Sequence, residues 1–211
     1  MSFTDILAKR RAVNFFDHEK EVSDAEIRSI IEKAALTPSS FNLQPWNVMI
    51  LRDSADKDKL RKLAMNQPKV TEAPVVLIVL ADRNGWQEGH PTLEQNFKQM
   101  VAAGDMKPEQ HDWFVGACQG LYGKDEATQQ AFAVKNTGFF AMSLMYAAAD
   151  AGLDTHPMDG FDHDGVREAF NIPERFWIPL LLCVGHFDQT KKLAPGKWRK
   201  KYEDIVVCFG D

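Results

Sequence analysis

An uninterrupted apolar run, VVLIVLA at residues 75–81, constrains the fold of this 211-residue chain more than any other segment. A strand with one solvated face alternates apolar and polar residues, whereas this run presents no polar position to solvent. It therefore predicts a strand that is buried on both faces. Residues 178–185, IPLLLCVG, predict a second strand of the same kind. Helices must cover both faces of such a sheet, so the pattern indicates an α/β or α+β fold.

Helical patterns fill most of the sequence between these runs. A capping box of Ser23 and Glu26 begins a helix that we predict over residues 24–36. Further helices are predicted over residues 2–11, 55–64, 92–103, 126–151 and 162–170, and further strands over residues 47–51 and 205–209. We expect one domain over residues 1–211, in which helices flank a central mixed sheet.

Charge and cysteine content exclude several classes of function. The net charge of −5 and the isoelectric point near 5.7 argue against nucleic-acid and anionic-membrane partners. No apolar run approaches the roughly 20 residues that span a bilayer, and the start of the chain lacks the apolar core of a secretion signal. Cys118, Cys183 and Cys208 form neither a disulfide framework nor a metal-binding spacing. We therefore expect a cytoplasmic protein.

The stretch TPSSFNLQPW at residues 37–46 lies between a predicted helix and a predicted strand. Its prolines disfavour helix at the residues before them. Ser39, Ser40, Asn42 and Gln44 supply side chains that both donate and accept hydrogen bonds. Such a loop suits a flat heterocycle with polar edges. Composition alone favours the other interpretation, an ordinary helix exit, because Ser, Asn and Pro are common turn residues.

The order of residues in this loop resembles the flavin-contacting loop of the nitroreductase family of FMN-dependent oxidoreductases, where forms like SPSS-N-QPW recur. The resemblance runs over nearly the whole chain and is weakest over residues 85–126. It implies a nitroreductase-like fold, FMN as cofactor, NADH or NADPH as electron donor, and a homodimer whose C-terminal strands are exchanged between subunits. The residues of the loop that it assigns to the flavin are Pro38, Ser39, Ser40, Asn42 and Gln44.

Residues 10–16, RRAVNFF, resemble the family's N-terminal flavin-binding signature, RRSxRxF. Arg10 matches, whereas Ala12 stands where Ser is usual and Asn14 where a cation is usual, and Arg11 can compensate. The family's other phosphate contact is a basic pair near the C-terminus, which Lys197 and Arg199 match. Arginine offers a planar fork to phosphate oxygens. As bare residues, the N-terminal arginines fit a charged helix end and the C-terminal pair fits a solvated surface.

The resemblance also assigns residues to the flavin ring. Asn66 and Lys69 match the spacing of an Asn and a Lys that approach the pyrimidine edge in the family. Met158, Asp159 and Gly160 match an element whose backbone N–H groups bond flavin N5, where a glycine lets the backbone approach the ring. Lys69 and Gly160 thereby receive the catalytic roles. The alternative for residues 66–69 is a solvated loop before a strand.

Residues 85–126 carry aromatic side chains in otherwise polar sequence. They predict either a small satellite core or, as the resemblance implies, a helical lid whose aromatics stack on substrate. Outside this segment, His156 and His163 could suggest a metal, but no further ligand accompanies them, and we expect no metal site.

The function that the resemblance implies is hydride transfer from NAD(P)H through FMN to a small-molecule acceptor, such as a nitroaromatic compound or a quinone. Two alternatives stay open: a sister reductase or dehydrogenase activity on the same fold, and a flavin-binding protein without turnover. A dinucleotide-binding Rossmann fold is not expected, because no GxGxxG follows any predicted strand.

Overall fold

The computed structural model describes residues 2–209. The helices are α1 (Phe3–Lys9), α2 (Asp24–Ala34), α3 (Ser54–Leu63), α4 (Lys69–Glu72), α5 (Pro91–Ala103), α6 (His111–Tyr122), α7 (Glu126–Asp150), α8 (His163–Ala169) and α9 (Tyr202–Ile205), with 3₁₀ turns η1 (Ser40–Asn42) and η2 (Pro108–Gln110). The strands are β1 (Trp46–Leu51), β2 (Val75–Asp82), β3 (Asp154–Met158) and β4 (Phe176–Gly185). Within residues 2–209, every helix is too short or too polar to span a bilayer.

The strands form one sheet in the order β1-β2-β4-β3. The two predicted apolar strands are the central neighbours β2 and β4, and every position of β2 is buried. All three strand pairs are antiparallel. A mixed sheet would also contain parallel pairs, and the parallel pairing in this structure is an isolated bridge between Ala12 and Thr155.

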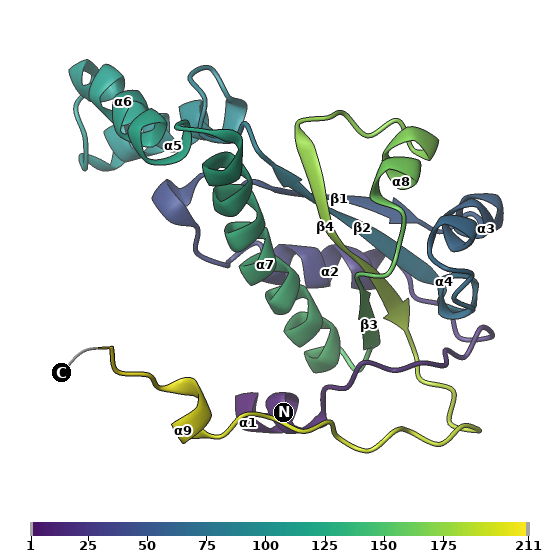
Figure 1. The fold of residues 1–211 in the computed structure, drawn as a ribbon. Coiled ribbons are helices and arrows are strands. Elements are labelled where there is room, and N and C mark those ends of the chain that lie inside the picture. The colour runs from purple at the N-terminus through teal and green to yellow at the C-terminus, as the bar shows by residue number, and fades with distance from the viewer. Residues whose placement is uncertain (1, 210–211) are drawn as a thin grey trace.

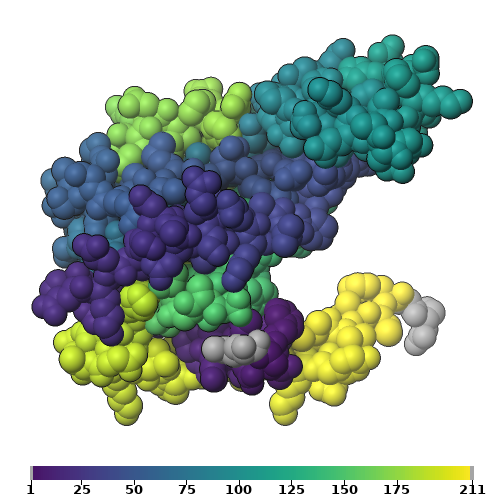
Figure 2. Space-filling model, turned by 180° about the vertical axis from the view of Figure 1, so that it is seen from behind, coloured from purple at the N-terminus to yellow at the C-terminus, as the bar shows by residue number. Residues whose placement is uncertain are grey.

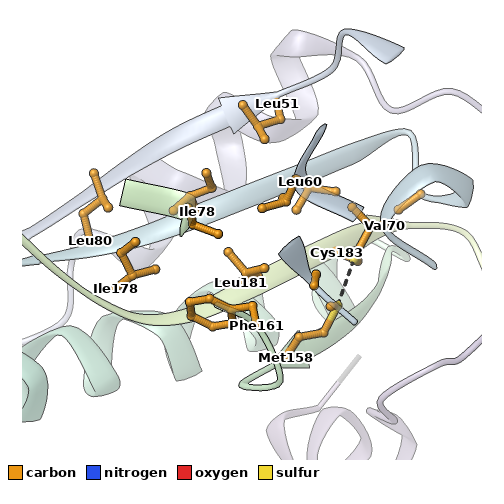
Figure 3. Close-up of a cluster of buried hydrophobic side chains, with 14 of the residues drawn as sticks. Leu51, Leu60, Val70, Ile78, Leu80, Met158, Phe161, Ile178, Leu181 and Cys183 are labelled. Carbon is orange, nitrogen blue, oxygen red and sulfur yellow. Dashed lines mark hydrogen bonds between the residues drawn. The ribbon is translucent and has the colours of Figure 1, made fainter. Parts of the chain in front are cut away.

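Helices cover both faces of the sheet, as the apolar strands required (Figure 1). Val75, Leu77 and Val79 of β2 pack in one cluster with α2 and α7. The alternate side chains of β2 pack on the opposite face with α3, α4 and α8. Figure 3 shows this second cluster, in which Leu60 and Val70 from the helices lie against the strands. The expected layering of helices on a sheet is confirmed.

The helices α2, α7 and α8 begin within one residue of where the sequence predicted them, and capping side chains are the reason. The Ser23–Glu26 capping box begins α2, and the side chains of Asp125 and Asp162 cap α7 and α8. Each cap satisfies backbone N–H groups that have no partner within the helix. After α7, Gly152 has a φ of 76°, which lets the chain turn back toward β3.

A third cluster of buried residues lies at one end of the sheet, where α5 and α6 form a lobe (Figure 1). Trp86, Phe97 and Phe114 are buried there with residues of α7 and of the loop before β1. The satellite core predicted for residues 85–126 is therefore present. Trp113 is different, because 65% of its side chain is exposed on α6.

The strand predicted over residues 205–209 is wrong for the single chain. Residues 202–205 form α9, and the segment after it has no regular structure. A strand needs a sheet edge to satisfy its backbone groups, and the single chain brings no edge to this segment. Phe209 is 93% exposed at its end.

Candidate functional site

Lys69 begins α4, next to the edge strand β3, and its ammonium group is the centre of a hydrogen-bonded cluster. Nζ lies 3.2 Å from Oδ1 of Asn14, 3.3 Å from Oε1 of Gln67 and 3.2 Å from Nε2 of His156. An ammonium group has three protons to donate, so these acceptors match its full capacity. The structure thus brings together Asn14 and Lys69, which the sequence placed at the same edge of the cofactor.

His156 has a defined tautomer. Its Nδ1 lies 2.7 Å from the carbonyl oxygen of Val13, which can only accept a hydrogen bond, so Nδ1 carries a proton. Nε2 of the neutral imidazole is then an acceptor for Lys69. Burial lowers the pKa of His156, and the positive charge of Lys69 lowers it further. Both effects favour the neutral ring.

The charge of Lys69 is not neutralised by a nearby acid. Among residues 2–209, no carboxylate oxygen lies within 4.0 Å of its Nζ. Burial lowers the pKa of Lys69, although the three acceptors suit the charged form. A half-buried cation with neutral partners attracts an anionic or electron-rich ligand edge more strongly than a paired cation does.

Gly160 adjoins this cluster. Nε2 of Gln67 donates to the Gly160 carbonyl at 3.1 Å, which leaves Oε1 of the same amide to face Lys69. A Cβ atom at position 160 would lie only 3.3 Å from Sδ of Met65. A side chain there would therefore press on the turn that carries Asn66, whose own side chain is exposed. Lys69, Asn66 and Gly160 lie in neighbouring segments.

A basic cavity of about 540 Å³ lies on the other side of this cluster. Its lining includes Asn14 and His156, so the cavity extends to the partners of Lys69. The cationic side chains that line it are Arg10, Arg11, Lys197 and Arg199, and Ala12 lines it as well. Residues from both ends of the sequence, which the resemblance assigned to a phosphate group, therefore share one cavity.

The two N-terminal arginines differ in how many of their guanidinium N–H groups already donate a hydrogen bond. Nη1 of Arg11 donates to the carbonyls of Ala8 and Arg10, at 2.8 and 3.1 Å. Arg10 is half-buried, and its guanidinium makes no hydrogen bond or salt bridge to residues 2–209. Arg10 therefore has the larger free capacity to bind an anion.

The polar loop before β1 does not line the basic cavity. Asn136 of α7 accepts a hydrogen bond from the Ser40 backbone at 3.0 Å, and Asn96 of α5 accepts one from Nδ2 of Asn42 at 2.9 Å. The helix α1, which ends at the basic cavity, instead contacts Tyr146, near the opposite end of α7 (Figure 1). Positions 136 and 146 are about 15 Å apart along a helix.

The structure therefore divides the predicted site residues into two sets. One set consists of the residues that line the basic cavity, represented by Arg10 and Asn14, together with Lys69, which is hydrogen-bonded to Asn14. Pro38 and Gln44 represent the set on the loop, whose remaining members are Ser39, Ser40 and Asn42. The single chain does not bring the two sets together.

The resemblance assigns Met158 to the flavin through its backbone, and its side chain lies away from the proposed site. Its side chain is buried in the core, where Sγ of Cys183 lies 3.7 Å from its Sδ (Figure 3). Only the backbone of Met158 is available to a ligand. The neighbouring Asp159 is exposed.

Sequence reasoning missed Gln67 and the role of His156. Gln67 lies between two residues that were singled out, but no pattern marks it as the link to Gly160. His156 was considered only as a metal ligand, because its position on β3 was not predicted. The pairing of β3 with the N-terminal segment, seen in the hydrogen bond between Val13 N and Thr155 O at 3.1 Å, is what gives the ring its partners.

Comparison with known proteins gives consistent similarities. Residues 7–186 match the nitroreductase family. MhqN of Bacillus subtilis (strain 168), named a putative NAD(P)H nitroreductase, is 28% identical over 205 residues, which cover 97% of this chain and 97% of the relative.

Two solved structures have similar folds. That of ydfN, a putative nitroreductase from Bacillus subtilis, has a TM-score of 0.89 and 27% identity, and the match covers 98% of both chains. That of a putative nitroreductase from Exiguobacterium sibiricum 255-15, solved in complex with FMN, has a TM-score of 0.85 and 29% identity, and the match covers 98% of this chain and 97% of the other.

Proposed function

The chain belongs to the nitroreductase family, and from this premise we propose that it is an FMN-dependent oxidoreductase that takes hydride from NADH or NADPH. Its acceptors are small molecules such as nitroaromatic compounds or quinones. The observation that carries the proposal is the basic cavity whose lining includes Asn14 and His156, two partners of the unneutralised ammonium group of Lys69. A nitroreductase solved with FMN and an NAD(P)H nitroreductase among the similar proteins support the choice of cofactor and donor.

The residues present fit FMN. Arg10, Arg11, Lys197 and Arg199 supply the charge that a phosphate group requires, in a cavity of about 540 Å³. Gly160 has no Cβ atom, which would lie 3.6 Å from Nε2 of Gln67, and its backbone therefore stays open to close approach. When bound, FMN supplies the hydride-accepting and hydride-donating chemistry, and the protein supplies binding and electrostatics.

Lys69 has the central electrostatic role in this proposal. A fixed cation lowers the free energy of negative charge that develops near it, because its orientation requires no rearrangement during the reaction. Asn14, Gln67 and His156 hold the ammonium group without reducing its charge. Gly160 and the backbone around it have a steric role, since they allow a close approach of the ring.

The complete site requires a second copy of the chain. In this proposal, the loop residues Ser39 to Gln44 of one subunit reach the basic cavity of the other, because the single chain holds them apart. Exposed apolar side chains on α1 and α7, including Phe3 and Phe139, support a homodimer. So does the surface hollow between the α5–α6 lobe and the segment that contains α9, which Figure 2 shows.

The α5–α6 lobe has the role of a substrate lid in this proposal. A second cavity, of about 320 Å³, lies between the polar loop and α5. It is lined by neutral amides, among them Asn42, Gln44, Gln95 and Gln99. Such groups bind the oxygens of nitro compounds and quinones without requiring a charged substrate. The free cysteines Cys118, Cys183 and Cys208 support the assignment to the cytoplasm.

The visible spectrum of the purified protein, with and without added FMN, tests the cofactor. We expect flavin absorption that co-purifies or is restored by FMN, and a colourless protein that cannot be reconstituted would overturn the proposal. Stopped-flow mixing with NADH or NADPH without oxygen then tests turnover. Rapid loss of the flavin band, followed by its return on addition of a quinone or a nitroaromatic compound, is expected. A loaded protein that no nicotinamide reduces would favour a flavin-binding protein without turnover.

A further inference from the structure

The partners of Lys69 share a property that the proposed function does not require. All three acceptors are neutral, although a carboxylate would hold a lysine more strongly. We propose that His156 is a positioning residue. Its neutral, Nδ1-protonated imidazole fixes the Lys69 ammonium group beside the cofactor site and leaves the charge of that group undiminished. The consequence for the cofactor rests on the proposed function.

The orientation of the ring is determined by the backbone. The Val13 carbonyl accepts a hydrogen bond from Nδ1 at 2.7 Å, and the backbone of His156 is fixed as part of strand β3. Because a carbonyl cannot donate, the alternative tautomer would place two acceptors against each other. Nε2 is therefore left as an acceptor 3.2 Å from Nζ of Lys69.

A second acceptor is oriented in the same way. The Gln67 amide donates through Nε2 to the Gly160 carbonyl at 3.1 Å, so its oxygen faces Lys69 at 3.3 Å. The ammonium group is thus held by two acceptors that cannot turn away without losing a hydrogen bond to the backbone. Three segments that carry predicted cofactor residues, 12–14, 66–69 and 156–160, meet at this one group.

Neutral partners have a functional consequence. A carboxylate in place of any of them would form an ion pair with Lys69 and cancel most of its field at the ligand. An apolar residue in place of His156 would leave the long lysine side chain free to turn toward solvent. Only a neutral acceptor at this position both fixes the cation and preserves its charge.

The tautomer is tested first, on the protein without FMN. Imidazole proton–nitrogen NMR distinguishes protonated from unprotonated ring nitrogens, and the signals of His156 are assigned by their loss in His156→Gln. We expect a neutral ring with its proton on Nδ1 at neutral pH. A charged ring, or a proton on Nε2, would overturn the inference. This measurement requires no bound cofactor, so it stands even if the proposed function fails.

The effect on the cofactor is tested with three variants. His156→Leu removes the acceptor, His156→Gln retains a neutral acceptor, and Gln67→Glu adds a negative charge beside Lys69. The midpoint potential of bound FMN and the affinity for oxidised FMN are measured for each. We expect His156→Leu to favour oxidised over reduced flavin by about tenfold, which corresponds to a potential about 30 mV lower for a two-electron couple.

Three comparisons separate positioning from general damage to the fold. His156→Gln should restore most of the potential, and Gln67→Glu should lower it at least as much as His156→Leu. His111→Gln, the same change in the α6 lobe where the ring contacts Glu94, should leave it unchanged. Equal potentials in wild type and His156→Leu would overturn the inference, as would a potential in Gln67→Glu at or above that of wild type. A wild-type protein that binds no FMN would instead refute the proposed function.

Discussion

Lys69 is the residue to which the proposed function assigns the stabilisation of charge on the flavin ring. Reduction of a flavin at neutral pH tends to leave negative charge on its pyrimidine edge, and a cation at about 4 Å stabilises that charge by roughly 4 kcal/mol at the effective dielectric of partly exposed sites. Solvent access reduces the effect to about 1–3 kcal/mol. Lys69→Ala should therefore lower the midpoint potential by roughly 20–65 mV, which a spectroelectrochemical titration measures. Coincident titration curves would show that Lys69 does not face the flavin.

Arg10 and Arg11 form a matched pair for testing the phosphate contact. Arg10→Ala should weaken FMN binding by about ten- to a hundredfold, since a hydrogen bond to a charged group contributes roughly 1.5–3 kcal/mol. Arg11→Ala should have a smaller effect, because Nη1 of Arg11 already donates to the carbonyls of Ala8 and Arg10. Isothermal titration with FMN compares the two variants. The reverse order would mean that Arg11 is the phosphate ligand.

His156 should also make the stability of the protein depend on pH. Burial, and then the charge of Lys69, lower its pKa in the folded state from the ordinary histidine value of 6.5, because both disfavour the charged ring. The unfolded chain then binds more protons than the folded chain as the pH falls below 6.5, so this contribution to stability is present above that pH and is lost below it. Urea unfolding at several pH values measures the loss, and His156→Gln should make it smaller. An unchanged pH dependence in the variant would place the titration elsewhere.

At this scale, local patterns in the sequence identified Arg10, Asn14 and Lys69, because each belongs to a short segment that resembles a known one. They did not identify His156 as a partner of Lys69. Its two hydrogen bonds join residues 87 and 143 positions apart, and such contacts exist only after the chain has folded. Residue-level prediction thus finds candidates among side chains that a motif contains and misses those that support it from another element.

The helices and strands also divide into those that a local sequence pattern predicted and those that it did not. The apolar runs gave β2 and β4, and the caps at Asp125 and Asp162 gave the starts of α7 and α8. The edge strand β3 was not predicted, because its five residues, DTHPM, include Asp, His and Pro, which are uncommon in central strands. Over the described residues 2–209, β3 has on its outer side only an isolated bridge to the N-terminal segment, and such a strand tolerates residues that hide it from pattern analysis.

Asn136 connects two elements and should be more costly to remove than its helical propensity suggests. It is fully buried, accepts from the Ser40 backbone and donates to the Phe132 carbonyl. Asn136→Ala leaves the Ser40 N–H without a partner, which should cost about 1–3 kcal/mol. We expect faster hydrogen exchange over residues 39–44 together with this loss in urea unfolding.

A cap on the same helix provides the control for Asn136. Asp125→Ala removes the N-cap of α7 and should cost about 1 kcal/mol. Its hydrogen exchange should change at the start of α7 and not over residues 39–44. If both variants gave the same exchange pattern, Asn136 would support α7 in general and not the loop.

For the whole molecule, the separation of the two sets of site residues is the dominant constraint. The helix α7 contacts the Ser40 loop in its first half and contacts α1 near its last turns, so the two sets lie near different parts of this helix. The spacing of residues along a chain does not specify which copy of the chain supplies each of them, so the two sets are distinguished only in the folded structure.

The C-terminal segment provides the clearest test of the proposed dimer. The exposed fractions of Ile205, Val206, Val207 and Phe209 are 64%, 47%, 64% and 93%. Burying a side chain of this size contributes about 1.5–3 kcal/mol, and part of that is offset by ordering the segment. Removal of residues 205–211 should therefore weaken the dimer by at least about tenfold, since 1.4 kcal/mol is tenfold in affinity. Sedimentation velocity measures this.

If the site is completed by the partner, FMN binding must depend on protein concentration in the truncated chain. Below the dimer dissociation constant, each cavity lacks the loop of Ser39 to Gln44 and should bind FMN weakly, whereas high protein concentration should restore tight binding because Arg10 and Lys69 are intact. Trp113→Ser, which removes an aromatic side chain that is 65% exposed on the α6 lobe, is the control and should leave the dimer unchanged. A truncated chain that remains dimeric and binds FMN as tightly as wild type at every concentration would show that the segment has no part in assembly. A truncated chain that is monomeric but still binds FMN tightly would show that one chain suffices for the site, and the loop before β1 would then have a role other than contact with the flavin.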